Sequence, residues 1–152
     1  MITKRLVAAV VVSVAVMACS RRPATDSAGE TPSVSSTAAQ LQTTYWKLTA
    51  LGSTPVNVAD STREPHIILQ PDSKVNGSGG CNRMFGSYEV SGDALTFSGI
   101  GSTKMACQDG MDTETSFLPA LQRVAKYRID GQQLELLDAS GALVARFDAK
   151  PK

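Results

Sequence analysis

The chain has 152 residues, a formal net charge of +1, one histidine and three cysteines. Its 15 basic and 14 acidic residues nearly balance and are interspersed, which excludes the concentrated positive charge typical of a nucleic-acid-binding protein. We therefore expect a solvated surface of mixed charge and no nucleic-acid partner.

The N-terminus has the pattern of an export signal. Lys4 and Arg5 precede an apolar run from Leu6 to Met17, interrupted only by Ser13. A membrane-spanning helix needs roughly 20 apolar residues, so this run is too short to be a permanent anchor. The sequence therefore predicts a cleaved signal peptide over residues 1–18.

The predicted cleavage site has the form of a lipoprotein signal. The tetrapeptide Val16-Met17-Ala18-Cys19 resembles the bacterial lipobox, in which the cysteine thiol receives a diacylglyceryl group. This resemblance predicts a lipid on Cys19, and the alternative is ordinary secretion with a free thiol there. Ser20 follows, where a retained lipoprotein would have Asp. We expect an exported protein anchored to the cell envelope by lipid, on the periplasmic face of the outer membrane.

A flexible linker is expected over residues 19–43. Its composition is dominated by small and polar residues, and Val34 and Leu41 are its large apolar ones. Such a segment buries too little apolar surface to offset its ordering entropy. We accordingly expect one folded domain over residues 44–149.

The folded part is predicted to be mainly β. Short segments of alternating or β-branched apolar residues recur between Gly- and Asp-containing turns, which is typical of a small antiparallel sheet or barrel-like domain. The expected strands are Tyr45–Leu51, His66–Gln70, Phe85–Val90, Ala94–Phe97, Tyr127–Ile129, Leu134–Leu137 and Leu143–Phe147.

One helix is expected from about Gly110 to Val124. Asp109 is the expected N-cap, and Asp112 and Glu114 suit the positive end of the helix dipole. Pro119 is expected to bend this helix. The large apolar residues of the helix and strands that we expect in the core are Trp46, Leu48, Ile67, Leu69, Phe85, Tyr88, Leu95, Phe97, Phe117, Leu121, Leu136 and Phe147.

The order of short motifs resembles the META domain, or HslJ-like, family. The resemblance is carried by Tyr45-Trp46-Lys47-Leu48, by the run Val75 to Asn82 ending in Gly-Gly-Cys-Asn, and by Gly86-Ser87-Tyr88. Thr103-Lys104-Met105-Ala106-Cys107 and the Leu134–Leu137 strand complete it. The resemblance implies about eight strands plus a helix. It also implies a link to envelope stress or drug tolerance, without an established molecular activity.

Cys81 and Cys107 are the two cysteines that remain after lipidation. In an oxidising compartment an even pair within one small domain indicates a disulfide. The alternative is a pair of buried, reduced thiols that pack as small apolar groups.

No catalytic pattern is recognisable, so we expect a protein that is not an enzyme and has no cofactor or metal. His66 stands alone in the sequence, without the partners of a metal cluster or a triad. The Asn76–Asn82 segment lacks the Lys-Ser/Thr ending of a phosphate-binding loop, so its glycines indicate a tight turn or a bulge.

The functional hypothesis is therefore binding of an envelope protein or a small ligand by a tethered domain. The candidate contacts are Asn82, Arg83 and Lys104, beside the expected bridge. Two alternatives remain open at this point: an inhibitor of lysozyme-type enzymes, and an enzyme of unrecognised class.

Overall fold

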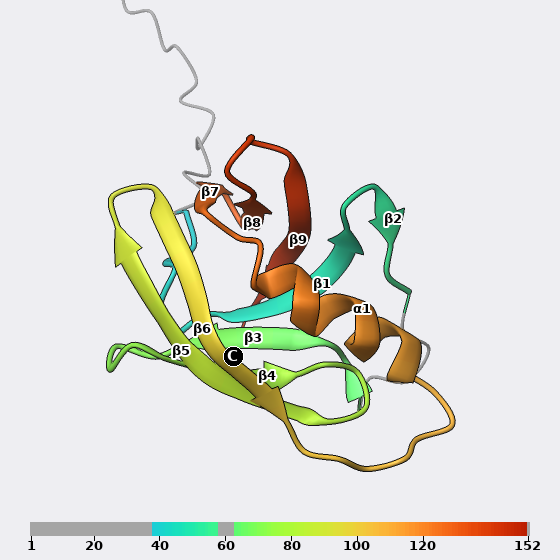
Figure 1. The fold of residues 1–152 in the computed structure, drawn as a ribbon. Coiled ribbons are helices and arrows are strands. Elements are labelled where there is room, and N and C mark those ends of the chain that lie inside the picture. The colour runs from blue at the N-terminus through green and yellow to red at the C-terminus, as the bar shows by residue number, and fades with distance from the viewer. Residues whose placement is uncertain (1–37, 58–62, 152) are drawn as a thin grey trace, which may run out of the picture. The chain divides into compact units, whose positions relative to one another are not determined.

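The computed structural model describes residues 38–57 and 63–151 (Figure 1). Over these ranges the chain forms nine strands and one α-helix, which confirms the expected mainly-β fold with a single helix. The expected signal peptide, the lipidated Cys19 and the linker up to residue 37 lie outside the described residues.

The strands make one antiparallel sheet in the order β2-β1-β3-β4-β5-β6-β7-β8-β9. An additional pairing of β1 with β9 joins the first long strand to the last, so all strands except β2 form a closed, barrel-like ring. The strand bounds are β1 Tyr45–Leu51, β2 Thr54–Pro55, β3 His66–Leu69, β4 Lys74–Ser78, β5 Arg83–Ser91, β6 Ala94–Ser102, β7 Lys126–Asp130, β8 Gln133–Leu137 and β9 Leu143–Lys150.

Alternation of side chains explains how the strands enclose a core. Trp46, Leu48 and Ala50 of β1 are buried, while the residues between them are half-buried, as the two-residue period of a strand requires. The β7–β8 turn contains Gly131 at φ 57°, a left-handed conformation that glycine adopts without a steric penalty. Tight turns of this kind keep neighbouring strands in register.

The ring has a weak seam between β6 and β7, whose register consists of the single pair Ala94 and Lys126. The helix α1, Met111–Leu121, contacts β6, β9 and β1, and its buried face packs against the core. Phe117 is fully buried, and its ring centroid lies 5.9 Å from that of Phe147 on β9. Figure 1 shows the long connection from β6 running round to α1. In the described ranges no helix is long and apolar enough to cross a membrane.

The helix boundaries differ from those expected. The N-cap is Gly110, at φ 86° and without a side-chain cap, instead of Asp109, and the helix ends at Leu121 instead of Val124. A Cβ on Gly110 would lie 2.5 Å from the carbonyl oxygen of Gly80, so close packing of two glycine backbones determines where the helix starts.

The expected core is confirmed with one exception, Phe85, whose side chain is 52% exposed. Met84 and Tyr88 on the same strand are buried, and Phe85 has the opposite parity. Its side chain must therefore face outward. The prediction that Phe85 lies in the core is wrong because hydrophobicity alone does not identify the inward face of a strand.

The folded part begins before Thr44. Residues 38–43, for which the composition predicts a linker, lie against the domain, and we call them the strap. The Ala39 N–H donates to the Gly131 carbonyl at 2.8 Å, and the Thr43 N–H donates to the Leu69 carbonyl at 2.8 Å. Leu41 packs on the core. These contacts are long-range, which is why composition alone placed the strap in the linker.

The sequence also did not predict β4. This strand occupies the start of the glycine-rich segment and pairs with β3 and β5. A Cβ on Gly77 would lie 2.0 Å from the His66 carbonyl oxygen, so glycine is required there by the approach of β3.

Candidate functional site

The turn between β4 and β5 meets the loop that follows β6. A disulfide joins Cys81 of this turn to Cys107 of the loop, with the two Cα atoms 5.9 Å apart. The expected bridge is thereby confirmed. It covalently fixes the loop of residues 103–110, which we call the clamped loop, to the edge of the sheet.

Asn82 attaches the clamped loop at a second place, in addition to the disulfide. Its side-chain Oδ1 accepts hydrogen bonds from the Met105 N–H at 2.7 Å and the Thr103 hydroxyl at 3.0 Å. Its Nδ2 donates to the Met105 carbonyl at 3.3 Å. One amide side chain thus satisfies both backbone groups of Met105, much as a neighbouring strand would.

Glu114, in the first turns of α1, completes a buried polar centre. Its carboxylate accepts hydrogen bonds from the Asn82 backbone N–H at 2.6 Å, from Asn82 Nδ2 at 3.1 Å and from the Ser102 hydroxyl at 3.0 Å. Asn82 is 3% exposed and Glu114 is 9% exposed. These donors are neutral, and among the described residues no ion pair involves Glu114, so hydrogen bonds compensate the burial of this carboxyl group.

The glycines of the turn allow this close packing. A Cβ on Gly79 would lie 2.6 Å from Glu114 Cγ, and Gly80 adopts φ 116° directly against Gly110. The expectation of a tight turn holds for Gly79 and Gly80. Their role is to let the start of the helix approach the sheet.

The structure brings the three candidate contact residues into one region but gives them different roles. Arg83 and Lys104 are exposed, and the Arg83 carbonyl accepts a hydrogen bond from the Thr103 N–H at 3.0 Å. Asn82 is buried, and its side-chain amide is hydrogen-bonded on both sides. The expectation that it contacts a partner is therefore corrected: Asn82 holds the clamped loop in place. Met105 beside Lys104 is 60% exposed and was not predicted as a contact.

Glu114 is the site residue that sequence reasoning misassigned, because we expected it only to favour the helix dipole. The signal was present in its spacing. Glu114, Phe117 and Leu121 fall on one helical face, three and then four residues apart, and all three are buried. A carboxylate on the apolar face of a helix indicates that another segment of the folded protein supplies its hydrogen-bond donors.

A second polar cluster surrounds His66. The rings of Tyr45 and His66 stack with centroids 4.2 Å apart, and His66 Nδ1 lies 2.8 Å from the Glu64 carbonyl oxygen. Burial, with the neighbouring Glu64 carboxylate, raises the pKa of Tyr45 to about 12. Lys47 pairs with Glu64 at 2.7 Å. These groups satisfy one another across β1 and β3, which favours a structural role.

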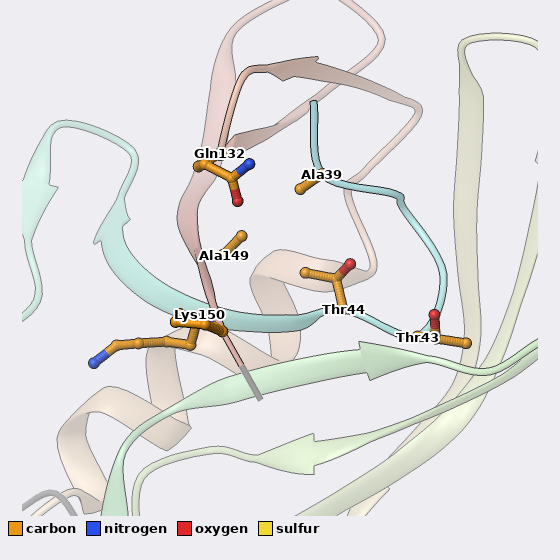
Figure 2. A pocket seen from close by; sticks show the side chains of 7 residues that line it. Ala39, Thr43, Thr44, Gln132, Ala149 and Lys150 are labelled. Carbon is orange, nitrogen blue, oxygen red and sulfur yellow. The ribbon is translucent and has the colours of Figure 1, made fainter. Parts of the chain in front are cut away.

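Figure 2 shows a groove between the strap and the end of β9, with a volume of about 600 Å³. Thr43, Thr44, Gln132 and Ala149 are among the lining residues. Lys150 also lines it, but its amine lies 3.9 Å from Glu64. Among the described residues, no group of three His, Cys, Asp or Glu side chains is placed to hold a metal ion.

Over the described residues, the fold and the site define a small, disulfide-bonded β-domain with a closed sheet, one helix packed on its core and a clamped loop. The chain belongs to the META domain family, whose family model matches residues 39–151. The match starts at the strap, in agreement with the contacts of Ala39.

Solved structures share this fold. A Burkholderia xenovorans protein, determined by NMR, is 26% identical with a TM-score of 0.60, over 74% of this chain and 85% of its own. A DUF4847 family protein from Bacteroides vulgatus, determined by crystallography, is 16% identical with a TM-score of 0.52, over 71% of this chain and 93% of its own. The second likeness concerns the fold alone. A search of curated proteins finds no match.

Proposed function

We propose that the protein is a non-enzymatic lipoprotein of the cell envelope whose META domain binds an envelope component. The proposed contact surface is made by Arg83, Lys104 and Met105, which we call the loop surface. The observation that carries the proposal is the exposure of Lys104 and Met105 on a loop whose backbone is hydrogen-bonded to Asn82, with Arg83 exposed at the adjoining start of β5.

The clamped loop is held in advance of any binding event. Asn82 satisfies the backbone of Met105, and the disulfide fixes Cys107 two residues later. A loop that is already ordered loses little conformational entropy on association. The Met105 side chain is flexible and polarisable, so it can adapt to a partner surface, and the two cations add electrostatic steering.

Features of the N-terminal sequence support the proposed envelope location. A lipid on Cys19 and a polar linker would hold the domain near a membrane while leaving it free to reach a fixed component. Resemblance to the META family supports a role in envelope stress or drug tolerance. We propose lipid anchoring on the periplasmic face of the outer membrane on these grounds.

In-cell photo-crosslinking tests the proposal. Probes at Arg83 and Lys104 are expected to capture a specific envelope component, whereas a probe at Arg123, an exposed cation that follows α1, is the matched control. Cys19→Ser should release the protein to the soluble fraction and reduce capture. A lysozyme-type adduct selects the inhibitor function. Equal capture from all three positions, or none from Arg83 and Lys104, contradicts the loop surface.

A further inference from the structure

Among the outward-facing residues of β3 to β6, three neighbouring cross-strand rows form a continuous surface, which we call the outer face. Strand register aligns His66 with Ser78 and Ser78 with Arg83, and it aligns Ile68 with Asn76 and Asn76 with Phe85. In the remaining register, Phe85 lies opposite Gly101, Lys74 opposite Ser87, and Ser87 opposite Ser98.

The three rows carry two cations and several hydrogen-bonding side chains. Lys74 and Arg83 are exposed, and neither forms an ion pair within the described ranges. No residue of the three rows is acidic. Glu89 faces outward on β5 opposite Thr96, one row beyond Ser87. Asp72 Oδ1 accepts a hydrogen bond from the Lys74 backbone N–H at 3.3 Å, so acidic groups border the rows at the Lys74 end. Lys74 and Ser78 are separated by about 13 Å along β4 at the usual rise of a strand.

Phe85 provides a flat apolar surface at the centre. Its side chain is 52% exposed, and its ring atoms Cε2 and Cζ lie 3.1 Å from the position that a Cβ on Gly101 would occupy. The ring therefore covers the glycine backbone. An exposed aromatic ring held in this way can pack against the C–H face of a pyranose.

The chemistry of the outer face favours a glycan over other partners. Protein interfaces are centred on clusters of large apolar side chains, whereas in the three rows Phe85 is the one large exposed apolar side chain and the half-buried Ile68 lies two strands away across Asn76. Single-stranded nucleic acid is bound by several stacking aromatics, and the rows contain one exposed ring. Small-molecule sites are concave, whereas this surface follows the strands.

We propose that the outer face binds an extended, carboxylate-bearing polysaccharide. One sugar ring packs on Phe85, carboxylates of neighbouring sugars pair with Arg83 and Lys74, and hydroxyls bond to Asn76 and Ser78. Arg83 also belongs to the loop surface. The inference therefore rests on the proposed function and names the class of envelope component bound.

Calorimetry with the full exported protein tests this with defined probes. Oligogalacturonate is the carboxylated probe, its methyl ester is the same glycan without charge, and a thymidine oligonucleotide is an unrelated polyanion. We expect Phe85→Ala and Arg83→Gln each to weaken oligogalacturonate binding by roughly tenfold or more, as loss of one packed ring or one charge-assisted contact implies. Arg123→Gln should leave affinity unchanged, and melting curves confirm that each variant is folded.

The outcomes separate the two proposals. Absence of oligogalacturonate binding, or equal binding of the ester or the oligonucleotide, overturns the glycan. Unchanged affinity of folded Phe85→Ala and Arg83→Gln overturns the outer face as its site. If glycan binding is absent while Lys104 still captures a component in cells, the proposed function stands and only the glycan inference fails.

Discussion

Two glutamates in different regions of the domain are stabilised in contrasting ways. Glu114, at the junction of α1 and the clamped loop, is held by neutral donors from Asn82 and Ser102. Glu135, on the outer side of β8, lies between two arginines and hydrogen bonds to Arg128 and Arg146. The hydrogen bond from Arg128, supported by Arg146, holds the pKa of Glu135 below its usual value.

The difference concerns what each carboxylate contributes. Neutral hydrogen bonds are directional and buried here, so the Glu114 contacts specify one arrangement of turn, loop and helix. The arginines around Glu135 are partly exposed, with relative side-chain exposures of 66% and 38%. Water and salt screen such pairs, and exposed pairs typically contribute less than about 1 kcal/mol. The contacts of Glu114 should therefore determine the local structure, whereas the ion pairs of Glu135 should make only a small contribution to stability.

The largest expected effect is loss of the bridge. The double variant Cys81→Ser/Cys107→Ser should lose about 3.5 kcal/mol of unfolding free energy, because an open loop of this length regains entropy in the unfolded chain. Urea denaturation measures the loss. Cys19→Ser, which leaves the bridge intact, is the control. Equal midpoints for the double variant and this control would show that Asn82 alone holds the clamped loop.

A somewhat smaller loss is expected when the buried polar centre is changed. Asn82→Ala removes the side-chain contacts to Met105 and Glu114 and should cost about 2 to 3 kcal/mol. Asn82→Asp keeps the shape but places a second carboxylate against Glu114, so its deficit should shrink as pH is lowered and one carboxyl is protonated. Denaturation over a pH series distinguishes the two variants. A pH-independent deficit for Asn82→Asp would contradict the assigned role of Nδ2.

The smallest effect is expected at Glu135. Glu135→Gln should cost less than about 1 kcal/mol near neutral pH, and added salt should reduce the difference. Because the folded-state pKa of Glu135 is depressed, its contribution is present above the ordinary glutamate pKa of about 4.3 and is lost as pH falls through the lower folded-state value. The wild-type and variant curves should therefore converge in acid. A difference that persists there would have to come from packing.

Local patterns in the sequence were sufficient for much of the fold. The period-two alternation around Trp46 and Leu48 places β1 correctly, and the spacing of Phe117 and Leu121 places the buried face of α1. Gly131 in its short turn indicates the β7–β8 hairpin. Each of these signals lies within a few residues, because the geometry of a strand, a helix turn or a hairpin is set by neighbours in the chain.

The candidate site was only partly accessible to such reasoning. The number of cysteines and the expected export predict the pairing of Cys81 with Cys107, which the structure contains. Arg83 and Lys104 are exposed, as contact residues must be. Whether Asn82 faces solvent depends on Met105 and Glu114, which are distant in sequence. The neighbouring sequence does not show whether a polar side chain is buried, because its hydrogen-bonding partners come from distant segments.

By itself, the sequence determined the mainly-β class, most strand positions and the single helix, because these depend on local periodicity. The cysteine count favoured the bridge, and the structure establishes it. Only the tertiary structure decided the closure of β1 on β9, the packing of the strap and the outward position of Phe85. It also decided that Gly110 starts the helix against Gly80. These features depend on register and close approach between distant segments, and the free energy of such contacts belongs to the pair and to neither segment alone.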